Sequence, residues 1–126
     1  MSVEENKKTL VVGASAKPDR YSNMAISLLK EKDISTVGFA PKAFEIYGID
    51  VLSDFEKLKS ENIHTVTMYI NPQRQPEYYD KILSIAPKRI IFNPGTENPE
   101  FYELARKKGV EVEEACTLVL LRTNQY

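Results

Sequence analysis

The stretch LVVGASAKPDRYSN, Leu10 to Asn23, has the order of residue types expected of a phosphate-binding turn. An apolar run leads to Gly13, where the backbone can approach a ligand closely, and Ser15 follows with a hydroxyl that can donate to a phosphate. A helix that begins after this turn would add unpaired N–H groups and the positive end of its dipole. The second and third glycines of the dinucleotide fingerprint are absent, so the stretch predicts an anion-binding turn of another kind.

Two cations close to this turn in the fold that we expect strengthen the prediction. Arg20 can bind a phosphate through both arms of its guanidinium group, and Lys42 follows an apolar run that ends at Phe39. A plain NAD site would place an acidic residue after this run, where it would bind the ribose hydroxyls. The chain instead reads Ala40-Pro41-Lys42, which favours a ligand with an additional phosphate on its ribose.

Apolar, β-branched runs separated by helical patterns predict the elements that position these residues. The expected strands are Thr9–Val12, Ile34–Phe39, Thr65–Ile70, Arg89–Phe92 and Val110–Val112, with a weaker one at Ile49–Leu52. Their alternation with helices indicates a three-layer Rossmann-like α/β fold with a parallel sheet of five or six strands. Right-handed crossovers favour the strand order 3-2-1-4-5(-6), with a flavodoxin-like order as the alternative. No linker or repeat divides the chain, so we expect residues 1–126 to form a single domain.

Capping signals predict where several helices begin and end. Ser53 and Glu56 have the spacing of a capping box, and Asn98 is expected to cap a helix that Pro99 begins and Gly109 follows. Apolar residues at helical spacing predict two further helices, one through Met24, Ile26, Leu28 and Leu29 and one, begun near Pro76, through Tyr78, Tyr79, Ile82 and Leu83.

Small and polar residues follow the expected strands. They are Gly13, Ala14 and Ser15 after the first, Pro41 and Lys42 after the second, Asn71 after Ile70, Asn93 and Gly95 after Phe92, and Cys116 soon after the last. Carboxyl ends of parallel strands meet at one edge of a sheet, where ligands bind near the point at which the strand order reverses. We therefore expect these residues to line one ligand site.

Three side chains have chemistry of their own. Cys116 is the only thiol, and it is either a reactive thiol at the start of a short helix or a small buried hydrophobe. Glu97 is expected to face the positive end of the next helix, with a general base as the alternative. His64 begins a strand without a catalytic partner nearby in sequence, which favours a structural role. One cysteine and one histidine offer no metal-ligand spacing and no intrachain disulfide.

The overall charge argues against attraction to nucleic acid or to an anionic membrane. The 126 residues include 17 basic and 18 acidic side chains, for a net charge of −1 at pH 7. No apolar run approaches the ~20 residues needed to span a bilayer. The first eight residues, MSVEENKK, lack the apolar segment of a signal peptide. We therefore expect a cytoplasmic location, no nucleic-acid partner and no membrane.

The chain resembles the small stand-alone CoA-binding domain proteins, whose fold is like the CoA-binding domain of the succinyl-CoA synthetase α subunit. The resemblance covers about residues 8–122 and rests on VVGASAKPDRYSN, EIYGIDV, FNPGTENPEF and EACTLVLL. The first stretch is the most specific, because Gly13-Ala14-Ser15 with Pro18 and Arg20-Tyr21-Ser22 is the family's form of the phosphate turn. Many relatives have Pro-Val-Asn-Pro where this chain has Gly38-Phe39-Ala40-Pro41, so the adenosine contact of that asparagine is missing.

The resemblance implies coenzyme A or an acyl-CoA as the ligand. It implies contacts from Gly13, Ser15, Arg20 and Tyr21, a place for Lys42 beside the nucleotide, and Asn93 and Gly95 near the pyrophosphate or the pantetheine. With their neighbours at the sheet edge, the expected binding residues are Gly13, Ala14, Ser15, Arg20, Tyr21, Pro41, Lys42, Asn71, Asn93, Gly95 and Cys116.

The expected function is binding of CoA without catalysis, as a carrier or regulatory protein that acts with a partner enzyme or as a homodimer. One alternative is a small NADP-dependent oxidoreductase, against which stands the absence of a Tyr-x-x-x-Lys pair and of a second, catalytic domain. The other is an acyl-CoA-processing enzyme that uses Cys116 or Glu97.

Overall fold

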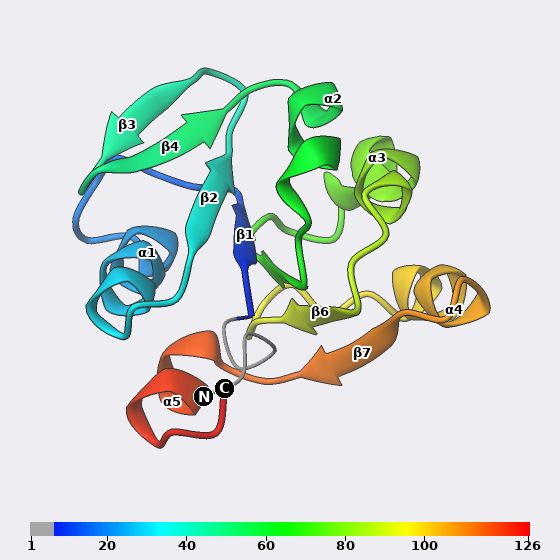
Figure 1. Ribbon diagram of the computed structural model, residues 1–126. Helices are drawn as coiled ribbons and strands as arrows, with labels where there is room; N and C mark the ends of the chain where they lie inside the picture. The colour runs from blue at the N-terminus through cyan, green and yellow to red at the C-terminus, as the bar shows by residue number, and fades with distance from the viewer. Residues whose placement is uncertain (1–6) are drawn as a thin grey trace.

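The computed structural model describes residues 7–126, which contain one seven-stranded sheet of order β3-β4-β2-β1-β5-β6-β7 (Figure 1). The strands are β1 (Thr9–Val12), β2 (Thr36–Phe39), β3 (Phe44–Ile46), β4 (Ile49–Leu52), β5 (Thr65–Met68), β6 (Arg89–Phe92) and β7 (Glu111–Glu114). The helices are α1 (Tyr21–Glu31), α2 (Phe55–Leu58), α3 (Tyr79–Ser84), α4 (Pro99–Lys107) and α5 (Thr117–Arg122), with 3-10 turns η2 (Lys59–Glu61) and η3 (Gln75–Tyr78).

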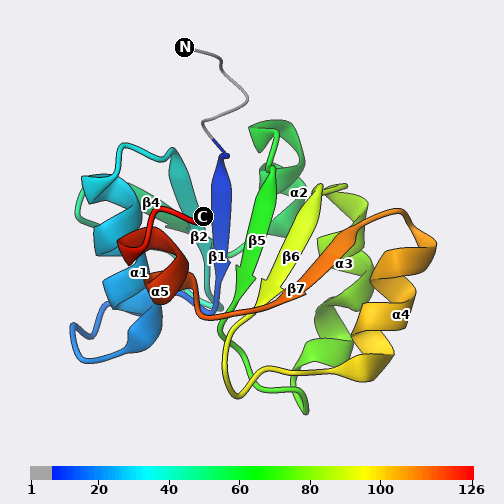
Figure 2. The ribbon, with the colours of Figure 1, turned by 90° about the horizontal axis from the view of Figure 1, so that it is seen from below.

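The sheet separates two apolar layers. Helices α1 and α5 cover one face, and α2, α3 and α4 cover the other (Figure 2). Alternation along β1 sends Leu10 and Val12 into the larger cluster, which includes Phe101 of α4, and Val11 into the smaller one, which includes Ile26 of α1. Strand β1 is buried on both faces, as expected of a central parallel strand.

The Rossmann-like strand order predicted from the sequence is confirmed, and the flavodoxin-like alternative is excluded. The run β4-β2-β1-β5-β6-β7 is the predicted order 3-2-1-4-5-6, and every neighbouring pair in it is parallel. The bounds of β1 and β6 are those predicted, and the weak strand at Ile49–Leu52 is present as β4. The predicted strand that reached Ile70 ends two residues earlier, at Met68, which brings Tyr69 out of the strand.

One edge strand was not predicted from the sequence. Strand β3 pairs antiparallel with β4, and a two-residue turn of Tyr47 and Gly48 joins them. Both turn residues have positive φ, 56° and 77°, the combination required by a type I′ hairpin turn. The strand has only three residues and is half-buried or exposed along its length, so its apolar pattern is weak.

Two predicted caps of α4 are confirmed, and the predicted cap of α2 is wrong. The Asn98 side chain accepts a hydrogen bond from the Phe101 N–H at 3.2 Å, and Gly109 follows the helix with φ +78°. Helix α2 is capped by Asp54 instead of Ser53, because the Asp54 carboxylate accepts from the Glu56 N–H at 2.9 Å.

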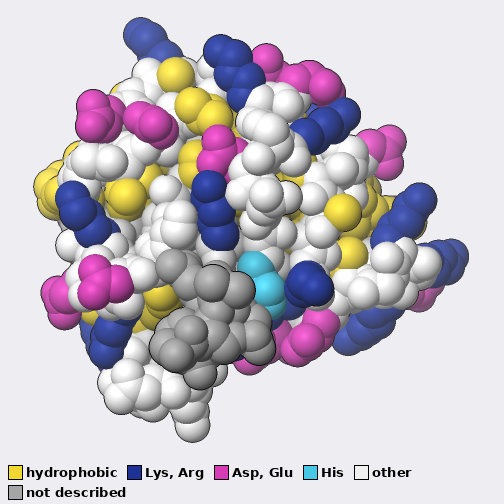
Figure 3. Space-filling model, in the orientation of Figure 1, with side chains coloured by type: hydrophobic (Ala, Val, Ile, Leu, Met, Phe, Trp, Pro, Cys, Tyr) yellow, Lys and Arg dark blue, Asp and Glu magenta, His cyan; other side chains and the backbone are white. Residues whose placement is uncertain are grey.

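Both ends of the sheet can be followed in the views. Figure 3 shows the face at which the strands begin, where basic and acidic side chains are interspersed and the one histidine, His64, lies. The carboxyl ends of the strands point the other way, toward the bottom of Figure 2.

No helix within residues 7–126 is long and apolar enough to cross a membrane. Most of the N-terminal segment on which the expected location rests, residues 1–6, lies outside the described residues.

The register of the central strands places their next residues side by side at the carboxyl edge. Val12 is level with Phe39 of β2 and with Met68 of β5, so Gly13 and Tyr69 leave the sheet at the same level. Gly13 has φ +95°, and its N–H donates to the Phe39 carbonyl at 3.0 Å. A Cβ atom at Gly13 would stand 2.9 Å from Cγ2 of Ile70, so the turn requires glycine for both its conformation and its space.

We expect Gly13→Ala to lower the free energy of unfolding by about 2–4 kcal/mol, because a strained φ and a steric clash add together. Gly109→Ala is the matched control, since Gly109 also has positive φ but a Cβ atom there would meet nothing within 4 Å. The control should cost about 1 kcal/mol. Urea unfolding followed by circular dichroism measures both. Equal losses in the two variants would contradict the close approach at Gly13.

Candidate functional site

A groove of three adjoining cavities follows the carboxyl edge of the sheet, and Tyr69 lines all three. The aromatic cavity, about 330 Å³, adds Phe39, Pro41, Ile70, Arg74 and Tyr78. The turn cavity, about 340 Å³, adds Ser15, Ser22, Gly95 and Thr96. The thiol cavity, about 290 Å³, adds Asn93, Cys116, Leu118 and Arg122. Gly13, Arg20 and Asn71 line both the aromatic and the turn cavity, while Tyr21 and Pro94 line both the turn and the thiol cavity.

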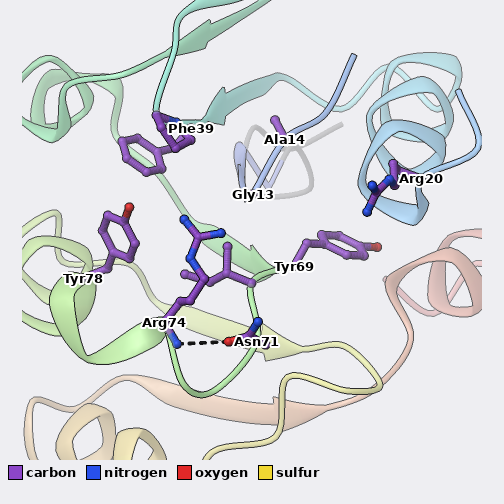
Figure 4. A pocket seen from close by; sticks show the side chains of 10 residues that line it. Gly13, Ala14, Arg20, Phe39, Tyr69, Asn71, Arg74 and Tyr78 are labelled. Atoms are coloured by element: carbon purple, nitrogen blue, oxygen red, sulfur yellow. Dashed lines mark hydrogen bonds between the residues drawn. The ribbon is translucent and has the colours of Figure 1, made fainter. Parts of the chain in front are cut away.

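Two guanidinium groups face the aromatic cavity. Figure 4 shows Arg74 pointing into it between Tyr78 and Tyr69, and Arg20 directed toward the same space from the start of α1. Within residues 7–126 neither arginine makes an ion pair, because the three present join other residues. Two unpaired guanidinium groups that converge on one cavity are suited to bind phosphate or carboxylate groups.

Two sets of hydrogen bonds hold the loop after β5, which carries Arg74. The Asn71 side chain accepts a hydrogen bond from the Arg74 N–H at 3.0 Å, drawn as a dashed line in Figure 4. Gln75 is fully buried, and its amide donates to the carbonyls of Ile70, at 3.0 Å, and Thr96, at 2.9 Å. The predicted site residue Asn71 therefore positions Arg74, besides lining the groove itself.

The turn after β1 presents several donors to the groove. The Ser15 hydroxyl accepts from the Lys17 N–H at 3.1 Å, which leaves its own proton for another acceptor. Asn23 donates to the Ser15 carbonyl at 2.9 Å and so holds the turn against α1. Arg20 occupies the N-cap position of this eleven-residue helix without capping it through its side chain. The N–H groups of Asn23 and Met24 donate to the Arg20 carbonyl, each at 3.1 Å.

Asn93 has a structural role that its position at a strand end did not suggest. Its amide donates to the Thr67 hydroxyl at 2.7 Å and to the Met68 carbonyl at 2.8 Å, and its oxygen accepts from the Thr117 N–H at 2.8 Å. Both amide hydrogens are therefore occupied, and the side chain is 2% exposed. A ligand contact of Asn93 stays a prediction and is limited to the remaining lone pair of its oxygen.

The groove has a carboxylate beside Gly95. The Gly95 N–H donates to the Glu97 carboxylate at 2.9 Å, so this backbone donor is already used. Glu97 is exposed and directly precedes the N-cap residue Asn98, which agrees with the predicted place near the start of a helix. A negative charge at this point disfavours a phosphate close to Gly95 and permits a neutral group there.

Tyr69 is the central residue of the groove and was not among the predicted binding residues. Burial raises the pKa of its phenol above the ordinary value, the nearby Cys116 adds to this, and the hydroxyls of Thr67 and Thr117 oppose it. The phenol therefore stays protonated and neutral throughout the physiological range. Cys116 is half-buried at the N-cap of the six-residue helix α5 and lines the thiol cavity.

The structure brings most of the predicted binding residues together, and the exception is Lys42. Ten of them, all but Lys42, line the groove, and Tyr21 does so although its side chain is 70% exposed. Lys42 is exposed next to Pro41 and lines none of the three cavities. His64 lies near the beginning of β5, where its N–H donates to the Lys8 carbonyl at 2.9 Å, so it is remote from the groove.

Sequence reasoning missed Tyr69, Arg74, Tyr78 and Arg122 as lining residues. The strand pattern that continued to Ile70 made Tyr69 resemble a strand residue, and the helical spacing made Tyr78 resemble a core residue. Arg74 had a usable signal, since it follows Asn71, Pro72 and Gln73 at an expected strand end. Arg122 had no such signal, because it lies beyond the last strand in a helix.

Solved structures and one curated relative are similar to this chain over most of its length. A crystal structure of an uncharacterized protein is 39% identical, with a TM-score of 0.89 over 95% of this chain and 98% of that one. The structure of "cell-free ID.343" from Thermus thermophilus is 20% identical, with a TM-score of 0.87 over 98% of this chain and 93% of that one. Uncharacterized protein YneT of Bacillus subtilis is 22% identical over 107 residues, which cover 85% of this chain and 78% of that protein.

The match to a family model extends over most of the chain. The model is described as a CoA binding domain. It matches residues 7–122, which begin two residues before β1 and end with the last residue of α5. Because this match covers more than half of the chain, the chain is a member of the CoA binding domain family.

Proposed function

We propose that this protein binds coenzyme A along the groove, as a binding, carrier or regulatory protein. The observation that carries the proposal is the pair of unpaired guanidinium groups, Arg20 and Arg74, beside the glycine turn at Gly13. CoA carries a pyrophosphate and a further phosphate on its ribose, and it therefore needs more cationic partners than NAD does. Membership of the CoA binding domain family supports the same ligand.

The chemistry of the three cavities supports one direction for the bound molecule. In Rossmann-like folds the adenosine lies toward the end of the second strand, and the pyrophosphate lies at the first strand-to-helix turn. Phe39 at the end of β2 packs edge-on against Tyr78 with ring centroids 5.4 Å apart, and both residues line the aromatic cavity together with Arg74. We place the adenosine in that cavity and the pyrophosphate at Gly13, Ser15 and Arg20.

The rest of the molecule then extends across the point where the strand order reverses. It passes Gly95, where the negative charge of the Glu97 carboxylate disfavours a phosphate but permits the neutral pantetheine. Beyond Tyr69 and Pro94 it reaches the thiol cavity, which places the CoA sulfur on the same side as Cys116. This direction assigns the predicted residue Gly95 to the pantetheine instead of the pyrophosphate.

The known reactive groups of the groove support binding more than catalysis. The Glu97 carboxylate is engaged by the Gly95 N–H, and no carboxylate or histidine, Glu97 included, lines any of the three cavities. The Tyr69 phenol has a raised pKa and is a poor proton acceptor at neutral pH. We therefore assign CoA binding to this site and no reaction.

We expect CoA to stabilise the protein against heat, and NAD to leave it unchanged. A ligand at 100 times its dissociation constant stabilises a fold by about 2.7 kcal/mol, which raises Tm by roughly 5 °C or more in a domain of this size. A thermal-shift panel of CoA, acetyl-CoA, NAD, NADP and ATP measures the difference. A clear shift with NADP and none with any CoA species would replace the proposal with a nicotinamide-dependent function.

We expect Arg20→Gln and Arg74→Gln each to weaken CoA binding about tenfold or more, the effect of losing one charge-assisted hydrogen bond. Lys17→Gln is the control, because Lys17 is exposed in the same turn but lines none of the three cavities. Isothermal titration with CoA measures all three, and the control should change affinity less than twofold.

The same variants, together with Lys42→Gln, identify the side chain that binds the phosphate on the ribose of CoA. When a residue that contacts this phosphate is replaced, the protein should lose its preference for CoA over dephospho-CoA. We expect that loss in Arg74→Gln, because Arg74 lines the aromatic cavity and Lys42 does not. Loss of the preference in Lys42→Gln alone would return this role to the lysine predicted from the sequence.

We expect CoA disulfide to modify Cys116, since the proposed direction brings the CoA sulfur to the thiol cavity. The Cys116 thiolate attacks one sulfur, a new S–S bond forms to one CoA, and the other CoA leaves as its thiolate. Intact-protein mass spectrometry should show one CoA adduct that dithiothreitol removes. Cys116→Ser, which removes the chain's only thiol, should carry no adduct and still bind CoA. An unmodified wild-type protein that binds CoA would contradict the proposed direction.

A further inference from the structure

The thiol cavity differs in character from the rest of the groove. Its walls are mostly apolar, with the rings of Tyr21 and Tyr69, Pro94 and Leu118, whereas the aromatic cavity is mostly polar. The amide hydrogens of Asn93, the buried polar side chain in its wall, are both bonded within the protein. Such a surface offers little to a phosphate and is suited to a short carbon chain.

The cavity is larger than the CoA thiol alone requires. At about 290 Å³ it holds roughly ten non-hydrogen atoms, taking the ~30 Å³ that one water occupies in the liquid as a guide. A glutaryl group, with five carbons and three oxygens, fits within this space. The end of the groove that would receive the CoA sulfur therefore has room for an acyl group attached to it.

Arg122, an exposed residue, borders this apolar cavity with a positive charge. It lies in the last turn of α5 and lines the cavity, and within residues 7–126 it makes no ion pair. A basic residue in the last turn is common, because it interacts favourably with the helix dipole, and α4 has Arg106 and Lys107 in the same position. Arg122 differs from these two in bordering one of the groove's cavities, where no acidic side chain accompanies it.

Resting on the proposed CoA site, we propose that the thiol cavity receives the acyl group of a CoA thioester and that Arg122 selects short acyl chains ending in a carboxylate. The apolar walls contact the methylene groups, and the guanidinium group binds the terminal carboxylate. The protein would then bind a dicarboxylic acyl-CoA in preference to free CoA and to an uncharged acyl-CoA of similar length.

The test compares three ligands by isothermal titration: CoA, glutaryl-CoA and hexanoyl-CoA, whose acyl chains are of similar length and differ in charge. We expect the wild-type protein to bind glutaryl-CoA about tenfold more tightly than hexanoyl-CoA, the effect of one charge-assisted hydrogen bond. Arg122→Gln should remove this preference, because it weakens the binding of glutaryl-CoA about tenfold more than it weakens the binding of hexanoyl-CoA.

Lys107→Gln is the matched control, because it removes a basic residue from the last turn of α4, which lies on the other face of the sheet. It should keep the wild-type preference. A wild-type protein that binds CoA but does not distinguish the two thioesters would overturn the inference and leave the CoA site intact. A preference that persists in Arg122→Gln would also overturn it. Failure of all three ligands to bind would instead reject the proposed function.

Discussion

The carboxyl edge of the sheet depends on the buried amide of Asn93. Its three hydrogen bonds join the end of β5, through Thr67 and Met68, to the first residue of α5. Thr117 strengthens the junction, because its hydroxyl pairs with that of Thr67 at 2.7 Å. A buried group left without its partner costs about 1–3 kcal/mol, so every member of this network constrains the others. The network therefore determines where Cys116 and Arg122 lie.

A second buried amide organises the neighbouring loops. Gln75 binds the carbonyls of Ile70 and Thr96 and accepts a hydrogen bond from Asn98 at 2.9 Å. It thereby links the loop that carries Arg74 to the loop that carries Gly95. Because two loops from different strands share one buried partner, the arginine and the opposite wall of the groove keep a constant relation. A preorganised site of this kind loses less conformational entropy when a ligand binds.

Charge along the groove is local and not a property of the whole protein. The chain carries a net charge of −1, yet Arg20 and Arg74 converge on one cavity and Arg122 borders another. Between them, the Glu97 carboxylate lies beside Gly95. A ligand with anionic groups at one end, or at both ends with a neutral stretch between, matches this sequence of charges. CoA and its thioesters have that arrangement.

Much of the fold was predictable because its signals are local. Apolar runs separated by helical patterns predicted the parallel strands, right-handed crossovers favoured their order, and capping signals predicted the cap at Asn98. The rule that parallel strands end at one edge then predicted that Gly13, Asn71, Asn93 and Cys116 would line one groove. Strand β3 was not predicted, because three half-buried or exposed residues are too few to show the apolar pattern of a strand.

The sequence by itself thus determined most of the strand segments and the glycine turn, because each depends on neighbours a few residues apart. It favoured the Rossmann-like strand order, and the structure excluded the flavodoxin-like alternative. Only the tertiary structure decided which side chains reach the groove. Tyr69 is central because β5 ends at Met68, and Lys42 stays outside although it follows a strand. Arg122 lines a cavity because the pair of Thr67 and Thr117, 50 residues apart, holds α5 at the edge of the sheet. Such contacts depend on packing between distant segments, which no local pattern encodes.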